Sequence, residues 1–316
     1  MNRKFAKDVE KGLHSIPKYL ESKYFYNEAG DQLFQKIMEL EEYYPTQCET
    51  EILVNHKELC RNFFQNSDSH FSLVELGAGD GLKTKILLHH FDQHQTNFSY
   101  LPIDISQNVL NILKSQVQKE IPGLRINPYH GDYFKALDQL NNREPGRKVI
   151  LFLGSTIGNF VYDDAVTFLN ELNKRMKEDD LLLIGFDLKK DPQVILNAYN
   201  DNKGITAAFN LNLLKRINHE LGGDFKTEWF YHYPTYNPTT GEAQSYLVSK
   251  VDQTVHISAL NQSFEFHIGE PIFMEVSKKY DLKTIEMLAE ASHFTIEKYF
   301  FDNKKYFTNA LWKKKK

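Results

Sequence analysis

The segment Ser72–Thr84, SLVELGAGDGLKT, contains the glycine-rich turn that decides the fold. Residues 73–76 form a short, mostly apolar run that predicts a buried strand, and the turn GAGDG at 77–81 ends it. The helical apolar spacing resumes at Leu82–His90. Strand, glycine turn and helix are typical of the start of a βαβ unit, in which glycines let the backbone approach a nucleotide-like ligand.

The same turn indicates which ligand fits. Leu82 stands where a dinucleotide fingerprint has its third glycine, and Asp80 lies inside the turn. A carboxylate there would repel a pyrophosphate at the helix N-terminus, which argues against NAD and ATP. The turn favours a nucleoside without phosphates, and S-adenosylmethionine, cationic at sulfur, fits best. Gly77 and Gly79 are therefore candidate cofactor residues.

Polar side chains also follow the next two predicted strands. Asp104 lies at the end of a strand at 100–105, where a carboxylate can accept both ribose hydroxyls. Its alternative role is a helix cap, which Ser106 could provide alone. Asp132 and Tyr133 follow a predicted strand at 125–129 and could contact the adenine amino group and ring. Each acid alone says little, but three strand ends in series point to one carboxyl edge of a sheet.

The most apolar run, Val149–Leu153, predicts a central strand that ends in the polar loop GSTIGNF at 154–160. A loop in that position is where an acceptor meets a transferred group in an open α/β sheet. A fifth strand is predicted at 181–186, and a helix at 108–118. Strands separated by helices in this rhythm predict a mostly parallel sheet, and so an α/β fold.

The flanking segments have a different pattern. Helical spacing is present on both sides of the predicted sheet, and alternation typical of β-structure runs from 228 to 268. We therefore expect the N-terminal helices and an inserted segment to form a second, α+β part. The predicted helices are 9–20, 32–40, 49–58 with Thr46 as cap, 191–199, 206–221 and 284–291, and a last strand is predicted at 294–301.

Composition excludes several classes of protein. The chain has 316 residues, a net charge of −4 and a pI near 6.3 without a basic patch, so no nucleic-acid partner is expected. No apolar run approaches the roughly 18–20 residues of a membrane helix, and no signal segment precedes the first helix. Cys48 and Cys60 form no disulfide framework, which favours the cytoplasm. The 12 histidines show no metal-ligand spacing, we expect a monomer, and Lys313–Lys316 is predicted as a solvated tail.

Several longer strings resemble one known family. They are YYPT at 43–46, ELGAG at 75–79, FLGSTIGN at 152–159, GITAAFN at 204–210 and EVSK at 275–278. Together they resemble the histidine Nα-methyltransferase family of ergothioneine biosynthesis, and the resemblance covers nearly the whole chain. It implies trimethylation of the α-amino group of L-histidine to hercynine, with S-adenosylmethionine as methyl donor.

The resemblance also implies a domain organisation. It predicts a class I methyltransferase with a Rossmann-like, mostly parallel sheet and a substrate domain built from the N-terminal region and an insertion. We assign residues 1–60 to the helical part of the substrate domain and 61–195 to the cofactor-binding core. Residues 196–285 are then the substrate-domain insertion, and 286–316 the C-terminal strand region that completes the core.

Individual roles follow from the resemblance. It implies that Gly77, Lys83, Asp104, Asp132 and Tyr133 hold S-adenosylmethionine. It further implies that Asn159 and Tyr199 grip the α-amino-acid end of the substrate, and that Tyr43, Glu275 and Ser277 bind the imidazole. Asn159, Tyr199 and Tyr43 are the residues assigned to catalysis.

One segment departs from the family pattern. The family usually has R-I-E-M where this chain has EAQS at 242–245, so Ser245 replaces a methionine that borders the substrate. The pocket wall becomes smaller and more polar, which leaves another aromatic amino acid or a tryptophan-like amine as an alternative substrate. A methyltransferase-like binding protein without turnover is a third possibility, against which the intact set Gly77, Gly79, Asp104, Asn159 and Glu275 argues.

Overall fold

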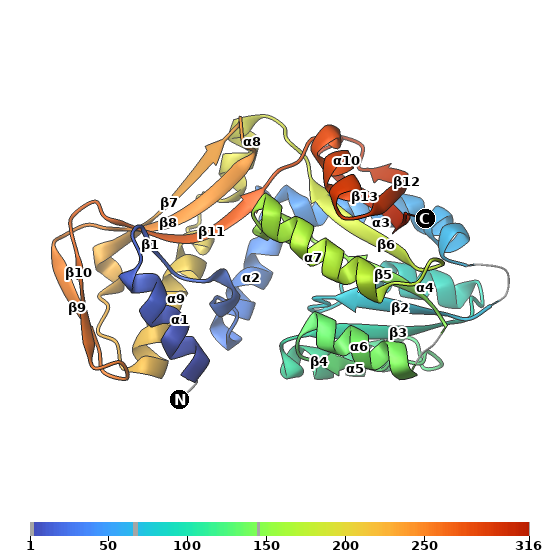
Figure 1. The fold of residues 1–316 in the computed structure, drawn as a ribbon, viewed down its shortest axis with the longest axis horizontal. Coiled ribbons are helices and arrows are strands. Elements are labelled where there is room, and N and C mark those ends of the chain that lie inside the picture. Colours follow the sequence, from blue (N-terminus) through green and yellow to red (C-terminus); the bar gives the residue numbers. More distant parts are fainter. Residues whose placement is uncertain (1–2, 66–68, 144–145, 316) are drawn as a thin grey trace. The chain divides into compact units, whose positions relative to one another are not determined.

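The computed structural model describes residues 3–65, 69–143 and 146–315, and it divides the chain into two compact units (Figure 1). Unit 1 comprises Met1–Tyr44 and Lys189–Lys278, and unit 2 comprises Pro45–Leu188 and Lys279–Lys316. The predicted boundaries after residues 60, 195 and 285 all lie further along the chain than these divisions. Residues 45–60 join unit 2 because helix α3 (Tyr44–Phe64) packs on that unit's sheet, with the Phe64 and Phe71 rings 6.4 Å apart.

Unit 2 is built on one twisted sheet, whose strand order is β12-β13-β6-β5-β2-β3-β4. β13 runs antiparallel to both of its neighbours, and the other pairings are parallel, which confirms the predicted mostly parallel sheet. β2 pairs with β3 on one side and with β5 on the other, so the strand order reverses there, at the point where open α/β sheets bind ligands. The strands are β2 (Phe71–Leu76), β3 (Phe98–Asp104), β4 (Tyr129–His130), β5 (Arg147–Phe152), β6 (Leu181–Asp187), β12 (Phe294–Phe301) and β13 (Phe307–Lys314).

Helices cover both faces of this sheet. Side chains alternate along a strand, and Val74 and Leu76 of β2 point into a core shared with helices α6 (Tyr133–Arg143), α7 (Tyr162–Arg175) and α10 (Leu282–Ala291). Phe71 points to the other face, where its ring lies 6.4 Å from that of Phe64 of α3 and 6.2 Å from that of Phe91 of α4 (Thr84–Gln93). Helix α5 (Gln107–Glu120) follows β3.

Two predictions at the sheet edges are wrong. The strand expected at 125–129 is reduced to β4 and one bridge between Ile126 and Tyr100, because Pro128 has no N–H to donate. The strand expected at 294–301 is present as β12, but it is not the last strand, because β13 follows it and contains the first lysines of the expected tail. Lys313 pairs with Glu297 at 2.5 Å, and the Lys314 ammonium donates to two backbone carbonyls at 3.0 and 3.1 Å. Lys316 lies outside the described residues.

Unit 1 combines the N-terminal segment with the inserted one. Its sheet has the order β1-β11-β8-β7, and β1 (Lys18–Tyr19) runs parallel to β11 (Pro271–Lys278), so the two segments share one sheet. β7 (Phe230–Asn237) and β8 (Glu242–Ser249) complete that sheet, and β9 (Gln253–Ile257) with β10 (Gln262–Phe266) forms a separate hairpin. The helices are α1 (Arg3–His14), α2 (Glu28–Met38), α8 (Pro192–Ala198) and α9 (Ile205–Leu221).

The boundaries of the first and third helices differ most from the prediction. The helix expected at 9–20 begins and ends earlier, as α1, and β1 takes its C-terminal residues. Thr46 is not a cap, because α3 begins at Tyr44 with Pro45 in its first turn, a position that needs no backbone N–H. Within residues 3–65, 69–143 and 146–315, no helix combines the length and hydropathy needed to cross a bilayer.

Candidate active site

The glycine turn of unit 2 has a left-handed backbone that only glycine adopts readily. Gly77, Gly79 and Gly81 have φ of +72°, +54° and +66°. The Gly77 N–H donates to the Ile103 carbonyl at 2.8 Å, which attaches the turn to the end of β3. A Cβ added to Gly77 would lie 2.8 Å from the Tyr133 hydroxyl oxygen. A side chain at Gly77 would therefore displace the Tyr133 hydroxyl, which lies against the turn.

Asp104 braces the turn from the end of β3. One carboxylate oxygen accepts the Gly79 N–H at 3.1 Å, and the other accepts the Ser106 N–H at 2.9 Å. A carboxylate has about four acceptor sites, so these two hydrogen bonds leave capacity for ribose hydroxyls. Gly77, Gly79, Asp104 and Tyr133, all predicted as cofactor residues, thus lie together at the carboxyl edge of the sheet.

Asp132 has a structural role in the same region. Its Oδ1 accepts the backbone N–H groups of Phe134 and Lys135, each at 3.1 Å, and thereby caps the first turn of α6. The cap directs the chain so that the next residue, Tyr133, reaches Gly77. Burial, and secondarily the charge of Asp104, raise the pKa of the Tyr133 phenol, so its hydroxyl stays protonated and can donate a hydrogen bond.

Lys83, the last residue before α4, forms an ion pair with Glu49 of α3. Glu49 is completely buried and also accepts the Gly154 N–H, at 2.8 and 3.1 Å to its two oxygens, and the Asn309 amide at 2.9 Å. One carboxylate therefore joins the glycine turn to the second turn, after β5. The Lys83 ammonium carries three N–H donors, so this pairing does not use all of them.

Asn159 lies at the end of that second turn, in the short helix η2 (Thr156–Asn159), and is exposed. Ser155 precedes η2 with a left-handed φ of +54°, and its hydroxyl accepts the Asp187 N–H at 2.9 Å. The turn is thereby attached to the end of β6. Asp187 is buried in an ion pair with Lys279, with 2.8 Å between the carboxylate oxygen and the ammonium nitrogen.

The predicted substrate residues of unit 1 lie on one face of its sheet. Glu275 of β11 is directly opposite Ser245 of β8, and Ser277 is opposite Ala243, so all of these side chains share a face. A bulge between Phe273 and Glu275 sets this register. Without the extra residue, Glu275 would point to the opposite face, because side chains alternate along a strand.

Tyr199 joins this face through a hydrogen bond. Its hydroxyl donates to the Ser277 hydroxyl at 2.8 Å from the residue that follows α8. Tyr43 belongs to a group of aromatic rings in the same unit, with its ring 6.4 Å from Phe34, whose ring lies 5.8 Å from Phe209. Tyr43 is half-buried and packs against the core of unit 1.

Comparison with known proteins identifies the family. The family model for histidine-specific, S-adenosylmethionine-dependent methyltransferases matches residues 5–314. The chain belongs to this methyltransferase family. It is 36% identical over 293 residues to the histidine N-alpha-methyltransferase of Mycobacterium tuberculosis, covering 91% of this chain and 88% of that one. It is 28% identical over 286 residues to the L-tryptophan methyltransferase of Psilocybe serbica, covering 83% and 78%.

A second bacterial relative agrees. The histidine N-alpha-methyltransferase of Mycolicibacterium smegmatis is 35% identical over 287 residues, covering 90% of this chain and 87% of that one. The protein is thus an S-adenosylmethionine-dependent methyltransferase with a Rossmann-like core, as the sequence predicted.

The turn of this methyltransferase fits a cofactor without phosphates. Asp80 Oδ1 accepts the Leu82 N–H at 3.0 Å, so a carboxylate already occupies the position in which a phosphate would bind before α4. Aromatic and carboxylate groups at Tyr133 and Asp104 suit an adenosine moiety instead.

Sequence reasoning gave no role to Glu75, which lies close to the turn of the methyltransferase. Glu75 is buried in β2, directly before the turn, and accepts hydrogen bonds from the Thr84 hydroxyl at 2.6 Å and from the Tyr100 hydroxyl. Burial raises its pKa to about 7, although both hydrogen bonds oppose the shift. A carboxylate within an otherwise apolar strand was the signal in the sequence.

His232 of β7 was also missed. Its Nε2 lies 3.2 Å from the Ser245 hydroxyl oxygen, on the face that carries Glu275 and Ser277. Burial lowers the pKa of His232 to about 4, so the ring is neutral at pH 7. No local motif marks this residue, because only the pairing of β7 with β8 brings it to Ser245.

Proposed function

We propose that this methyltransferase trimethylates the α-amino group of L-histidine to hercynine, the first step of ergothioneine biosynthesis. The observation that carries the proposal is the polar face of β8 and β11, with Ser245, Glu275 and Ser277. An imidazole offers an N–H donor and, when neutral, an acceptor. Glu275 would accept from the N–H, and Ser277 would make the second contact. The family description and the names of the mycobacterial relatives support histidine as substrate.

The cofactor is assigned to the turn of unit 2. When bound, S-adenosylmethionine supplies a methyl group activated by its sulfonium. Gly77 and Gly79 would allow the close backbone approach, Asp104 would bind the ribose, and Asp132 with Tyr133 would bind the adenine. Lys83 would direct its remaining donors to the cofactor while its pairing with Glu49 keeps it in place.

The chain's contribution to the chemistry is alignment. Asn159 and Tyr199 are assigned to the α-amino-acid end of the substrate, and Tyr43 is assigned to its imidazole. The amine must be neutral to attack, and each transfer releases one proton, which would leave through water or a tyrosine hydroxyl without a dedicated base. Holding the reacting groups in line can be worth about 7–11 kcal/mol. Tyrosine rings would favour the trimethylammonium product by cation–π contact.

A tryptophan-like amine is the second candidate. Ser245 replaces a family methionine, and the neutral His232 ring lies against it, so this wall of the face is polar. An indole N–H could also donate to Glu275, and one relative is named for tryptophan. Few contacts separate such side chains, so this wall decides between them.

The first test measures binding and product together. Calorimetry with histidine, tryptophan and tyrosine, with and without S-adenosylhomocysteine, would accompany mass spectrometry of the reaction products. Histidine binding with three methyl-for-hydrogen replacements supports the leading proposal. Reaction of tryptophan alone supports the second candidate, and cofactor binding without any reaction contradicts both.

Variants of the polar face test the residue roles. Glu275→Gln should abolish histidine binding and leave S-adenosylhomocysteine binding unchanged. Tyr199→Phe and Ser277→Ala should each raise the KM for histidine about two- to tenfold, the range for one neutral hydrogen bond. Because the two hydroxyls bond each other, the KM of the double variant should not exceed that of the single variant with the higher KM. Additive losses would contradict a shared role.

Two further predictions accompany this function. We propose that the enzyme acts in the cytoplasm, since both cysteines are free and buried, and that it works as a monomer. Light scattering of the purified protein tests the second statement, and a dimer at micromolar concentration would contradict it.

A further inference from the structure

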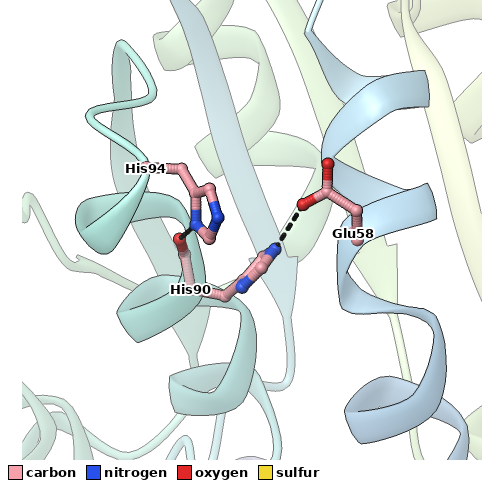
Figure 2. A group of neighbouring side chains, drawn as sticks. All are labelled: Glu58, His90 and His94. Carbon is pink, nitrogen blue, oxygen red and sulfur yellow. Dashed lines mark hydrogen bonds and ion pairs between the residues drawn. The ribbon is translucent and has the colours of Figure 1, made fainter.

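Two helices of unit 2 bring three candidate metal ligands together (Figure 2). Glu58 lies on α3, His90 on α4, and His94 directly after the end of α4. One ligand atom from each of the three side chains lies within 4.8 Å of the other two. Within the described residues, these three side chains form the one group of three or more histidines, cysteines or carboxylates whose ligand atoms come this close together.

The hydrogen bonds in this group show which ring nitrogens carry a proton. His90 Nε2 lies 2.9 Å from Glu58 Oε2, and His94 Nδ1 lies 2.8 Å from the His90 carbonyl oxygen. The carbonyl can only accept, so Nδ1 of His94 carries the proton and Nε2 carries the lone pair. Histidines that bind metals usually donate their other ring N–H to a carbonyl or carboxylate in this way. His94 therefore offers Nε2 to an ion without a change of tautomer. The Glu58 carboxylate also only accepts, so His90 Nε2 carries a proton in this structure, and it becomes a ligand by releasing that proton as the ion binds.

We propose that Glu58, His90 and His94 form a binding site for a divalent transition-metal ion of the zinc class. Two imidazoles and one carboxylate are a donor set that Zn²⁺ accepts at about 2.0–2.2 Å. Ligand atoms at that distance in a tetrahedron are roughly 3.4 Å apart, so rotation of the exposed His94 and Glu58 side chains closes the set. The fourth position faces solvent, because Glu58 and His94 are both exposed.

Arg61 sets the expected strength of the site. Its guanidinium donates to both Glu58 oxygens, at 2.7 Å from Nη2 to Oε1 and 3.2 Å from Nε to Oε2. This contact orients the carboxylate, but its positive charge opposes a cation nearby. We therefore expect reversible loading, weaker than at a closed structural site with four protein ligands.

The bound ion would clamp α3 to α4. Glu58 and His90 are separated by 31 intervening residues, and the unfolded chain does not hold them together, so binding stabilises the folded unit. The site lies at the C-terminal end of α4, whereas Lys83 and the glycine turn lie at its N-terminal end. Methyl transfer should therefore not require the ion. No metal was expected from the sequence, because only the packing of α3 against α4 brings Glu58 to His90.

The test uses the full chain without an affinity tag and Zn²⁺ alone in a non-coordinating buffer. Calorimetry should show that the wild type binds one equivalent of Zn²⁺ saturably, and Zn²⁺ should raise the Tm of the protein. His94→Ala should weaken binding about tenfold or more, since the loss of a ligand should exceed the 10–100-fold effect of a lost outer partner. His89→Ala is the matched control, because His89 neighbours His90 but pairs with Glu120 at 3.1 Å.

The outcomes decide the proposal. Loss of the equivalent and of the Tm shift in His94→Ala, with both retained in His89→Ala, supports the site. Equal binding by the wild type and His94→Ala places the ion elsewhere and overturns the proposal, as does the lack of saturable binding by the wild type. S-adenosylhomocysteine binding reports that each variant is folded, and it should not change with Zn²⁺ or with either substitution.

Discussion

The glycine turn of unit 2 and the polar face of unit 1 differ in what holds their side chains. In unit 2, carboxylates bond the backbone: Asp104 accepts from Gly79 and Glu49 from Gly154. In unit 1, side chains bond each other, Tyr199 with Ser277 and His232 with Ser245. A backbone-bound site tolerates few changes, whereas a single substitution alters a site built from side-chain pairs. If the polar face binds the substrate as proposed, we expect variation in substrate to arise in unit 1.

The largest expected effect tests the buried brace of unit 2. Glu49→Ala leaves the Lys83 ammonium, the Gly154 N–H and the Asn309 amide without their shared acceptor. We expect the free energy of unfolding to fall by about 3–5 kcal/mol, as when one partner of a buried ion pair is removed. Urea unfolding measures it. As a control, substitution of the exposed neighbour, Gln47→Ala, should change the free energy of unfolding by no more than about 0.5 kcal/mol. A loss below about 1 kcal/mol in Glu49→Ala would contradict the prediction and show that water replaces the Glu49 carboxylate.

The second prediction concerns pH and Glu75. Burial raises the pKa of Glu75 from 4.5 to about 7 in the folded protein. The folded state then binds more protons than the unfolded state between these values, so this stability is complete below pH 4.5 and is lost as the pH rises to 7. The loss should be on the order of 3 kcal/mol and absent in Glu75→Gln. An exposed control, Glu178→Gln, should keep the wild-type slope of unfolding free energy against pH.

His232 of unit 1 should make the free energy of unfolding depend on pH in the opposite direction. Burial lowers the pKa of His232 from 6.5 to about 4, so the unfolded state binds more protons in this window. Stability from the neutral ring is complete above pH 6.5 and is lost as the pH falls to 4. Because the side chain is partly exposed, we expect only about 2 kcal/mol. His232→Gln should remove this acid slope and the exposed His219→Gln should not; the same slope in all three proteins would contradict the assignment.

The smallest effect compares two glycines of one turn. Gly77→Ala and Gly79→Ala each place a side chain at positive φ, at a cost of about 1–2 kcal/mol. Only at Gly77 does the new Cβ meet an atom, the Tyr133 hydroxyl oxygen; at Gly79 no atom lies within 4 Å. Gly77→Ala should therefore weaken S-adenosylhomocysteine binding more than Gly79→Ala, and Tyr133→Phe should partly relieve it. If calorimetry shows equal losses of S-adenosylhomocysteine affinity in Gly77→Ala and Gly79→Ala, the contact with Tyr133 is not the cause of the weaker binding.

The sequence predicted what local pattern determines. Apolar runs predicted β2, β5 and β6 to within two residues at each end, and the glycines predicted the turn and its cofactor. What it missed depends on pairing between distant segments. The bulge before Glu275 decides which face that carboxylate occupies, yet no residue type marks it. Glu49 reads as an ordinary helical glutamate until folding brings Lys83, Gly154 and Asn309 to it. The same reason hid His232 and the strand β13.

The position of β1 beside β11 has a consequence for the order of folding. Residues 18 and 19 pair with 272 and 273, so the N-terminal segment emerges from the ribosome long before its partner strand exists. β13 similarly inserts between β6 and β12 after both have been synthesised. Such non-local pairing slows folding, and β6 stays an open edge until β13 has been synthesised. A nascent chain arrested before residue 307 should therefore need chaperone protection that the finished enzyme does not.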